Sequence, residues 1–209
     1  MCVIAVSRSG NRQPTTDELR SMWKHNPDGA GYMFAESGKV IIHKGFMSFD
    51  DFIRSVKSEH FTDGDSVVYH FRISTQAGRT PQMTHPFPLT HHLRECEYLD
   101  CWCPIGIAHN GIISLTTDHS ETTYSDTALF ITKYLSKIVR TPGDLDDQDV
   151  LDMIEHLGGW SKFTLMDGIG TITTIGEFTE DDGILLSNTN HLAHTITRWN
   201  QTIQNFMNK

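Results

Sequence analysis

Short apolar runs separated by turn residues constrain the fold of this chain most strongly. Eight runs of five to eight residues are rich in Val, Ile, Tyr or Phe, as is typical of β-strands. A first group of strands is expected at Cys2–Ser7, Gly31–Ala35, Lys39–His43, Ser66–Ile73 and Ile105–His109. A second group is expected at Lys162–Asp167, Thr171–Ile175 and Gly183–Ser187.

Helical spacing of apolar residues separates these strand groups. Helices are predicted over Thr15–Lys24, Phe49–Ser58, Asp126–Arg140, Asp147–Leu157 and Thr195–Met207. Thr16 is expected to cap the first helix, with Asp17 and Glu18 in its first turn. Strand groups separated by helices favour a layered α+β fold over a doubly wound sheet. The segment 76–102 is expected to be irregular, and a long irregular segment in a compact domain is more often functional than not.

Composition limits the classes of protein to which the chain can belong. Its 209 residues fit one domain, residues 1–209, and no repeat or linker divides them. A net charge of −9 without a Lys/Arg cluster excludes a nucleic-acid surface, because binding phosphates requires clustered cations. No apolar run approaches the ~20 residues of a membrane span, and no signal peptide is visible. We therefore expect a cytoplasmic protein without membrane contact, with its four cysteines reduced.

Cys2 follows the initiator methionine and opens the first predicted strand. Removal of Met1, which the small cysteine side chain favours, would place a thiol and a free α-amine on one residue. The α-amine titrates near pH ~7.7–8.0 and a free thiol near ~8.5, so the amine can act as the base for the thiol. This arrangement predicts a nucleophile. The alternative is that Cys2 is a small buried apolar residue.

Arg72 lies in the block His70–Gly78, at the point where a predicted strand ends. A guanidinium group in this position can hold a carboxylate through two hydrogen bonds. The alternative is an arginine at the surface in an ion pair, which would contribute little. Both interpretations remain open from the residues alone.

Two further blocks combine turn residues with polar groups. Asn110-Gly111 lies between two apolar pairs, which is a strong signal for a hairpin turn. Alternatively, the Asn110 side-chain amide and the Gly111 N–H can converge to form an oxyanion hole, since glycine permits a close approach. In the block Tyr124–Thr127, Ser125 or Asp126 can cap a helix, and Asp126 can also face an ammonium group.

Together these blocks resemble the class II glutamine amidotransferase domain, a member of the N-terminal-nucleophile hydrolases. The shared features are the Met1-Cys2 start, the block 70–78, His85-Pro86, His109–Gly111 and Ser125–Thr127, in the family's order over roughly the first 130 residues. The turn at residues 26–31 is also similar to the family's glycine-rich turn. The resemblance implies a four-layer α-β-β-α sandwich that acts without a cofactor or metal.

The resemblance also implies a reaction. Cys2 would attack the side-chain amide of glutamine and form a thioester, with its freed α-amine relaying the proton. Asn110 and Gly111 would stabilise the tetrahedral oxyanion. The products would be glutamate and ammonia, and the ammonia would pass to a separate acceptor, a synthetase. The chain could instead hydrolyse another γ-glutamyl or small amide, or be a catalytically silent binding module.

Substrate contacts follow from the same resemblance. Arg72, assisted by Thr75, would bind the α-carboxylate of the substrate, and Asp126 its α-ammonium group. His85 and Gln76 would lie at the pocket wall. The arginine block departs from the family's pattern, which often has an aromatic residue directly after the arginine and a histidine before the glycine.

Cysteines and histidines cluster between residues 91 and 103. The paired histidines 91–92 and Cys96, Cys101 and Cys103 can in principle form a tetrahedral zinc site. The spacing lacks a C-x₂-C pair, so free or buried thiols are favoured and no metal is expected.

Overall fold

Two antiparallel sheets form the centre of the protein. The structure, a computed structural model, describes residues 1–73, 79–116 and 123–192. In pairing order the larger sheet contains β10 (Thr179–Asp181), β11 (Ile184–Leu186), β1 (Val3–Ser7), β4 (Val67–Phe71), β2 (Ala30–Glu36), β3 (Lys39–Phe46) and β6 (Asp100–Cys103). The smaller sheet contains β5 (Phe87–Pro88), β7 (Ile105–Asn110), β8 (Lys162–Asp167) and β9 (Ile172–Ile175).

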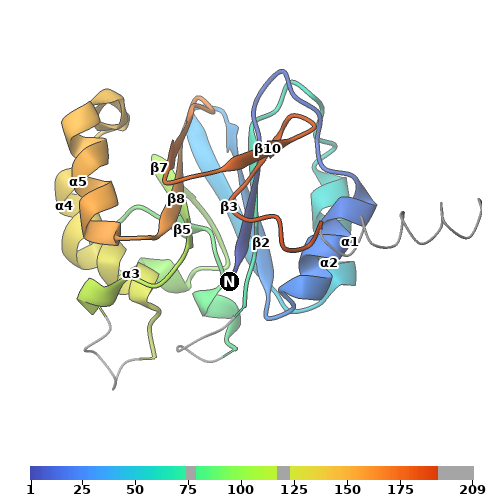
Figure 1. Cartoon of the computed structure of the whole chain (residues 1–209), viewed down its shortest axis with the longest axis horizontal. Coiled ribbons are helices and arrows are strands. Elements are labelled where there is room, and N and C mark those ends of the chain that lie inside the picture. Colours follow the sequence, from blue (N-terminus) through green and yellow to red (C-terminus); the bar gives the residue numbers. More distant parts are fainter. Residues whose placement is uncertain (74–78, 117–122, 193–209) are drawn as a thin grey trace, which may run out of the picture.

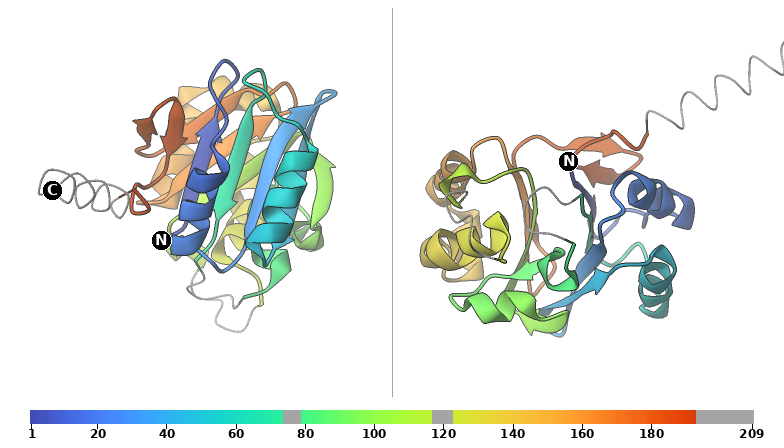
Figure 2. Two further views of the ribbon diagram at one scale, coloured as in Figure 1. Left: turned by 90° about the vertical axis from the view of Figure 1, so that its right-hand side faces the viewer. Right: turned by 90° about the horizontal axis from the view of Figure 1, so that it is seen from below.

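Helices cover the outer faces of both sheets, and the two sheets face each other (Figures 1 and 2). The larger sheet carries α1 (Thr16–His25) and α2 (Phe49–Ser58). The smaller sheet carries α3 (Asp126–Phe130), a π-helical turn η4 (Ile131–Leu135), α4 (Ser136–Ile138) and α5 (Gln148–Gly158). Short 3₁₀ helices lie at η1 (Pro81–Met83), η2 (Leu93–Glu97), η3 (Ser114–Thr116) and η5 (Pro142–Asp146).

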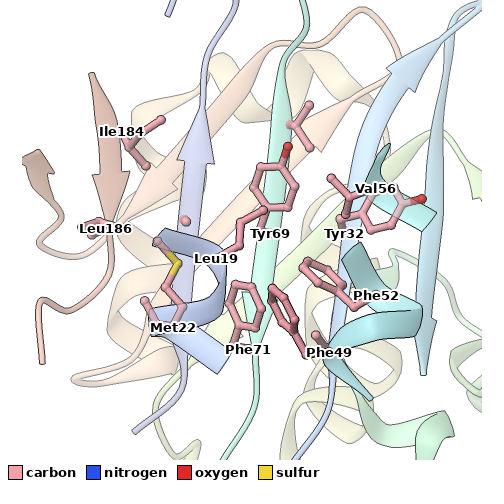
Figure 3. Close-up of a cluster of buried hydrophobic side chains, with 14 of the residues drawn as sticks. Leu19, Met22, Tyr32, Phe49, Phe52, Val56, Tyr69, Phe71, Ile184 and Leu186 are labelled. Carbon is pink, nitrogen blue, oxygen red and sulfur yellow. The ribbon is translucent and has the colours of Figure 1, made fainter. Parts of the chain in front are cut away.

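Three apolar clusters hold these elements together. One lies between the larger sheet and helices α1 and α2 and is rich in aromatic rings (Figure 3). A second lies between the two sheets, and a third between the smaller sheet and the helices α3 to α5. Burial of apolar area at ~25 cal/mol per Å² makes such clusters the main source of stability. None of the helices among the described residues is long and apolar enough to cross a bilayer.

The predicted helices are largely confirmed. Phe49–Ser58 has the bounds expected, and the segment Asp126–Arg140 is helical as far as Ile138. The expected cap of α1 is wrong by one residue, because Thr15 rather than Thr16 is the N-cap. Thr15 accepts a hydrogen bond from Glu18 N at 3.3 Å, and Glu18 Oε2 accepts from Thr15 N at 2.7 Å, which completes a capping box. The predicted helix Thr195–Met207 lies outside the described residues.

The predicted strands exist, and the two groups in which they occur along the sequence do not correspond to the two sheets. The strand at Ile105–Asn110 was expected with the first group, yet it pairs with β8 in the smaller sheet. The strand at Ile184–Leu186 was expected with the second group, yet it pairs with β1 in the larger sheet. Within 76–102, expected to be irregular, lie β5 and the start of β6. Strand pairing depends on contacts distant in sequence, which local composition does not encode.

Candidate active site

A cavity of about 830 Å³ opens where six segments of the chain meet. Its wall is built from the residues just before β1, the end of β4, the segment before β5, the end of β7, the start of α3 and the end of α5. The predicted site residues that line it are Cys2, Arg72, His85, Asn110, Gly111 and Asp126. Thr75 and Gln76, the remaining two, lie outside the described residues.

Cys2 is half-buried at the edge of this cavity. Its Sγ accepts a hydrogen bond from Ile73 N at 3.4 Å, and Asn188 Nδ2 donates to the Cys2 carbonyl oxygen. Burial raises the pKa of the Cys2 thiol, whereas the Ile73 N–H, the Arg72 guanidinium and the positive N-terminus each act to lower it. Burial therefore favours the neutral thiol, whereas these three groups favour the thiolate.

Arg72 is buried, with 5% of its surface exposed, and so it is not the surface residue of the second interpretation. Its backbone is fixed by the turn that precedes β2: Arg72 N donates to Gly29 O at 2.8 Å, and Asp28 N donates to Arg72 O at 3.0 Å. Burial lowers the pKa of the guanidinium, while the negative charges of Asp28 and Asp126 and the Cys2 thiolate oppose this shift. A buried cation at a cavity wall is suited to binding an anionic group.

Asn110 and Gly111 end β7 without forming a hairpin turn. The chain continues into η3, and β7 pairs with β8 rather than with the segment that follows Gly111. A Cβ atom on Gly111 would lie 2.5 Å from Ser161 Oγ, so this position requires glycine for close packing. Asn110 is buried, and its side-chain amide lies 2.9 Å from Ser187 Oγ.

Of the two roles predicted for the block 124–127, Ser125 caps the helix and Asp126 lines the cavity. Ser125 is the N-cap of α3, and its Oγ accepts from Ala128 N at 3.2 Å. Asp126 Oδ2 accepts from Ile113 N at 2.9 Å, and Oδ1 accepts from Thr127 N at 2.8 Å. The carboxylate thus ties the loop after β7 to α3 and still lines the cavity. Each carboxylate oxygen has more than one lone pair, so these bonds leave acceptor capacity for a ligand.

Three buried histidines lie against one another beside this wall. The ring centroids of His70 and His85 are 4.3 Å apart, and Thr127 Oγ1 lies 3.1 Å from His85 Nε2 and 2.8 Å from His109 Nδ1. Burial lowers the pKa of His70 to about 3, that of His109 to about 4, and that of His85 well below its usual value. All three rings are therefore neutral at physiological pH.

The remaining cysteines lie away from the cavity. Cys96 and Cys103 are buried, Cys101 is half-buried, and all three are free thiols. Over residues 1–73, 79–116 and 123–192, no group of three or more His, Cys, Asp or Glu side chains is arranged to hold a metal ion. Lys44 donates to the carbonyl oxygens of Gln82 and Cys96, and burial lowers its pKa to about 7.

The fold has counterparts among solved structures. Glutamine phosphoribosylpyrophosphate amidotransferase from B. subtilis, solved with ADP and GMP, matches 92% of this chain at 15% identity, with a TM-score of 0.57. A structure described as the allosteric regulatory enzyme of purine biosynthesis matches the same share at 17% identity, also with a TM-score of 0.57. The chain shares its fold with part of a glutamine amidotransferase.

The likeness to these two structures is one of fold. The chain spans less than half of the two matched structures, 43% of each. No protein-family model and no curated protein matches its sequence.

Two contacts of the site were missed by the sequence analysis. Ser187 and Asn188, directly after β11, hydrogen-bond to Asn110 and to the backbone of Cys2. Polar residues such as Ser and Asn are common in turns after a strand, so the local sequence did not mark these two as part of the site. His70 and His109 were also missed as site residues, although both lie inside the motif blocks that were singled out.

Proposed function

We propose that this protein is a glutamine amidotransferase of the N-terminal-nucleophile type, with a four-layer α-β-β-α arrangement. It would hydrolyse the side-chain amide of glutamine to glutamate and ammonia. The observation that carries the proposal is the cavity, which brings together a thiol at position 2, a buried guanidinium, an Asn-Gly step and a carboxylate. These groups come from distant parts of the sequence.

Catalysis would begin with removal of Met1, which frees the α-amine of Cys2. The amine takes the thiol proton as Sγ attacks the amide carbon, so a new C–S bond forms while the carbonyl π electrons move to oxygen. Burial holds the pKa of the thiol above its usual value, and the charge of Arg72 partly offsets this effect. Proton transfer to the amine is therefore coupled to the attack.

The tetrahedral intermediate would be stabilised at the end of β7. The Asn110 amide and the Gly111 N–H would donate to the oxyanion, and removing one such donor costs ~10²–10³ in rate. When the intermediate collapses, the α-ammonium returns its proton to the leaving nitrogen, and ammonia departs. Water then attacks the thioester with the amine again acting as base, which releases glutamate and restores the thiol.

Substrate binding would use the charged side chains of the cavity wall. Arg72 would bind the α-carboxylate through a bidentate pair, with help from Thr75, and Asp126 would bind the α-ammonium group. Gln76 and the neutral His85 would complete the wall. Ammonia would pass to a separate synthetase, because amidotransferase chemistry requires an acceptor.

The test is glutamine hydrolysis by the chain after Met1 removal, verified by intact mass. Diazo-oxo-norleucine, a glutamine-like electrophile, should label Cys2, and Cys2→Ala should abolish both labelling and ammonia release. Cys101→Ala is the matched control, because this half-buried thiol lies outside the cavity and its loss should leave both unchanged. Labelling at other cysteines with Cys2 unmodified would show that the site is wrong. A folded, processed chain without turnover would favour a silent binding module.

A second candidate substrate is a larger γ-glutamyl amide. Three of the side chains that line the cavity are apolar and exposed, namely Ile112, Leu115 and Trp160. The cavity volume falls in the range of ~300–1,000 Å³ typical of pockets for drug-sized ligands, which are larger than an amino acid. Comparison of kcat/KM for γ-glutamyl-p-nitroanilide and glutamine distinguishes the two, since a ratio well above one favours the larger amide.

A further inference from the structure

Ser187 connects the strand that carries the nucleophile to the Asn110 side chain. Ile4 N donates to Ser187 Oγ at 2.9 Å, and the Asn110 amide lies 2.9 Å from the same oxygen. Ser187 is 1% exposed and does not line the cavity. Its hydroxyl therefore supports the site from behind the wall.

The backbone of Ser187 is held on both sides. Ser187 N donates to Ile4 O at 3.0 Å, and Lys162 Nζ donates to Ser187 O at 2.7 Å. The bond to Ile4 continues the pairing of β11 with β1 by one residue, whereas the bond from Lys162 comes from β8 of the smaller sheet. A hydroxyl on so firmly bound a backbone can fix the orientation of its neighbour.

Hydrogen-bond accounting indicates how the Asn110 amide is oriented. With Nδ2 toward Ser187, Oδ1 of Asn110 is buried and no described residue donates to it. A hydroxyl offers one donor and two acceptor sites, and the Ile4 N–H fills one acceptor site. Turning the amide by 180° lets Oδ1 accept the Ser187 proton and places Nδ2 at the former position of Oδ1. Hydrogen bonding decides between the two ends of such an amide.

We infer that Ser187 is a positioning residue for the oxyanion hole. It donates to Asn110 Oδ1, so that Nδ2 is presented to the carbonyl oxygen of the substrate. This inference rests on the function proposed above for Asn110.

A double-mutant cycle tests whether Ser187 acts through Asn110. Ser187→Ala should lower kcat for glutamine about tenfold with KM within about twofold, because the hydroxyl affects a group that acts on the transition state. In an Asn110→Ala background, the same change should alter kcat by less than about twofold. Full additivity of the two losses would overturn the inference.

Thr164→Val is the matched control. Thr164 lies on β8 with an equally buried hydroxyl outside the cavity, and its loss should leave kcat within about twofold. Urea denaturation of every variant ensures that kcat refers to folded protein. If Thr164→Val lowers kcat as much as Ser187→Ala, the loss of any buried hydroxyl in the sheets lowers kcat, and the inference fails.

An NMR measurement decides the amide orientation independently of turnover. The Asn110 Nδ2 protons should show no strong NOE to the β protons of Ser187. A strong NOE would overturn the inference. If the processed wild-type chain neither hydrolyses glutamine nor is labelled, the proposed function fails, while this measurement still tests the contact.

Discussion

The two faces of β4 differ in chemistry although they belong to one strand. On the outer face, Val67, Tyr69 and Phe71 join the aromatic cluster beneath α1 and α2. On the inner face, Val68 packs between the sheets, and His70 then begins the polar wall that continues to Arg72. Because side chains alternate along a strand, one short segment stabilises the fold on one side and builds the site on the other.

The outer face is closely packed with aromatic rings. Phe52 from α2 meets Phe71 at 5.1 Å between ring centroids and Phe46 at 5.8 Å, both edge to face. Such pairs add about 0.5–1.5 kcal/mol beyond their buried area. Figure 3 shows the rings of Phe52 and Phe71 between helix and sheet. This cluster carries no polar group of the cavity wall.

The inner face carries a buried polar atom that lacks a partner. Among the described residues, no hydrogen bond reaches Nδ1 of His70, nor Nδ1 of His85, whose ring packs against His70. An unsatisfied buried polar atom costs about 1–3 kcal/mol. Residues of the outer face thus mainly stabilise the fold, and residues of the inner face mainly build the cavity. A substitution on one face can therefore change one property without the other.

The largest expected effect is on stability alone. Phe52→Ala should lower the free energy of unfolding by about 3–5 kcal/mol, because it leaves a cavity in a fully buried cluster. Urea denaturation measures this loss, and Met153→Ala, an exposed position on α5, should change stability by less than about 0.5 kcal/mol. The kcat of the folded Phe52→Ala protein should stay within a few-fold of wild type. A large fall in kcat would contradict the separation of the two faces.

A change on the inner side should affect substrate binding instead. Arg72→Lys should raise KM for glutamine about 10- to 100-fold, because lysine cannot form the bidentate pair with a carboxylate. Arg54→Lys is the control, since this exposed arginine pairs with Asp51 far from the cavity. Steady-state kinetics distinguishes the two variants. Unchanged saturation in Arg72→Lys would mean that Arg72 does not bind the carboxylate.

The pH dependence of Cys2 alkylation should show how burial and Arg72 affect the pKa of the thiol. Burial favours the neutral thiol, so the rate of alkylation by iodoacetamide should rise with pH through a midpoint above that of a free thiol. Arg72→Met removes a positive charge that favours the thiolate, and the midpoint should move to higher pH. Mass spectrometry of the Cys2 peptide follows the reaction. A midpoint that moves to lower pH would show that Arg72 does not act on the thiol.

The smallest effect is expected at a helix end on the outer side. Thr15→Ala should lower the free energy of unfolding by about 1 kcal/mol, because the Glu18 N–H loses its side-chain acceptor. Ser48→Ala is a close control, since Ser48 occupies the same position before α2 without a side-chain capping bond. Equal losses in the two variants would show that the capping bond adds nothing. Activity should be unchanged in both.

Local patterns predicted the elements well, because their causes are local. The helix Phe49–Ser58 and the strand Lys162–Asp167 have the expected bounds, since the periodicity of apolar residues defines them. Which strands pair in which sheet was not predicted, because the pairing joins distant segments, as where β1 pairs with β11 from the far end of the described chain. The edge strand β6 was missed, since half of its residues are exposed and its pattern is weakly apolar.

The site shows the same division. Cys2, Arg72 and Asp126 were found because their blocks resemble a known order of motifs, and the cavity brings them together. Ser187 and the histidine contacts were not found, because their importance arises from which strand lies beside which. Sequence reasoning located the groups that face the cavity and missed those that hold them in place.

The pairing of β1 with β11 has a consequence for synthesis of the protein. Ser187 and Asn188 reach Ile4 and Cys2 only after nearly all of the described chain has left the ribosome. At ~5–20 residues per second, that is about ten to forty seconds after Cys2 itself. During this interval Ile4 and Cys2 lack these two partners, so the start of β1 is fixed in its final place only late in synthesis.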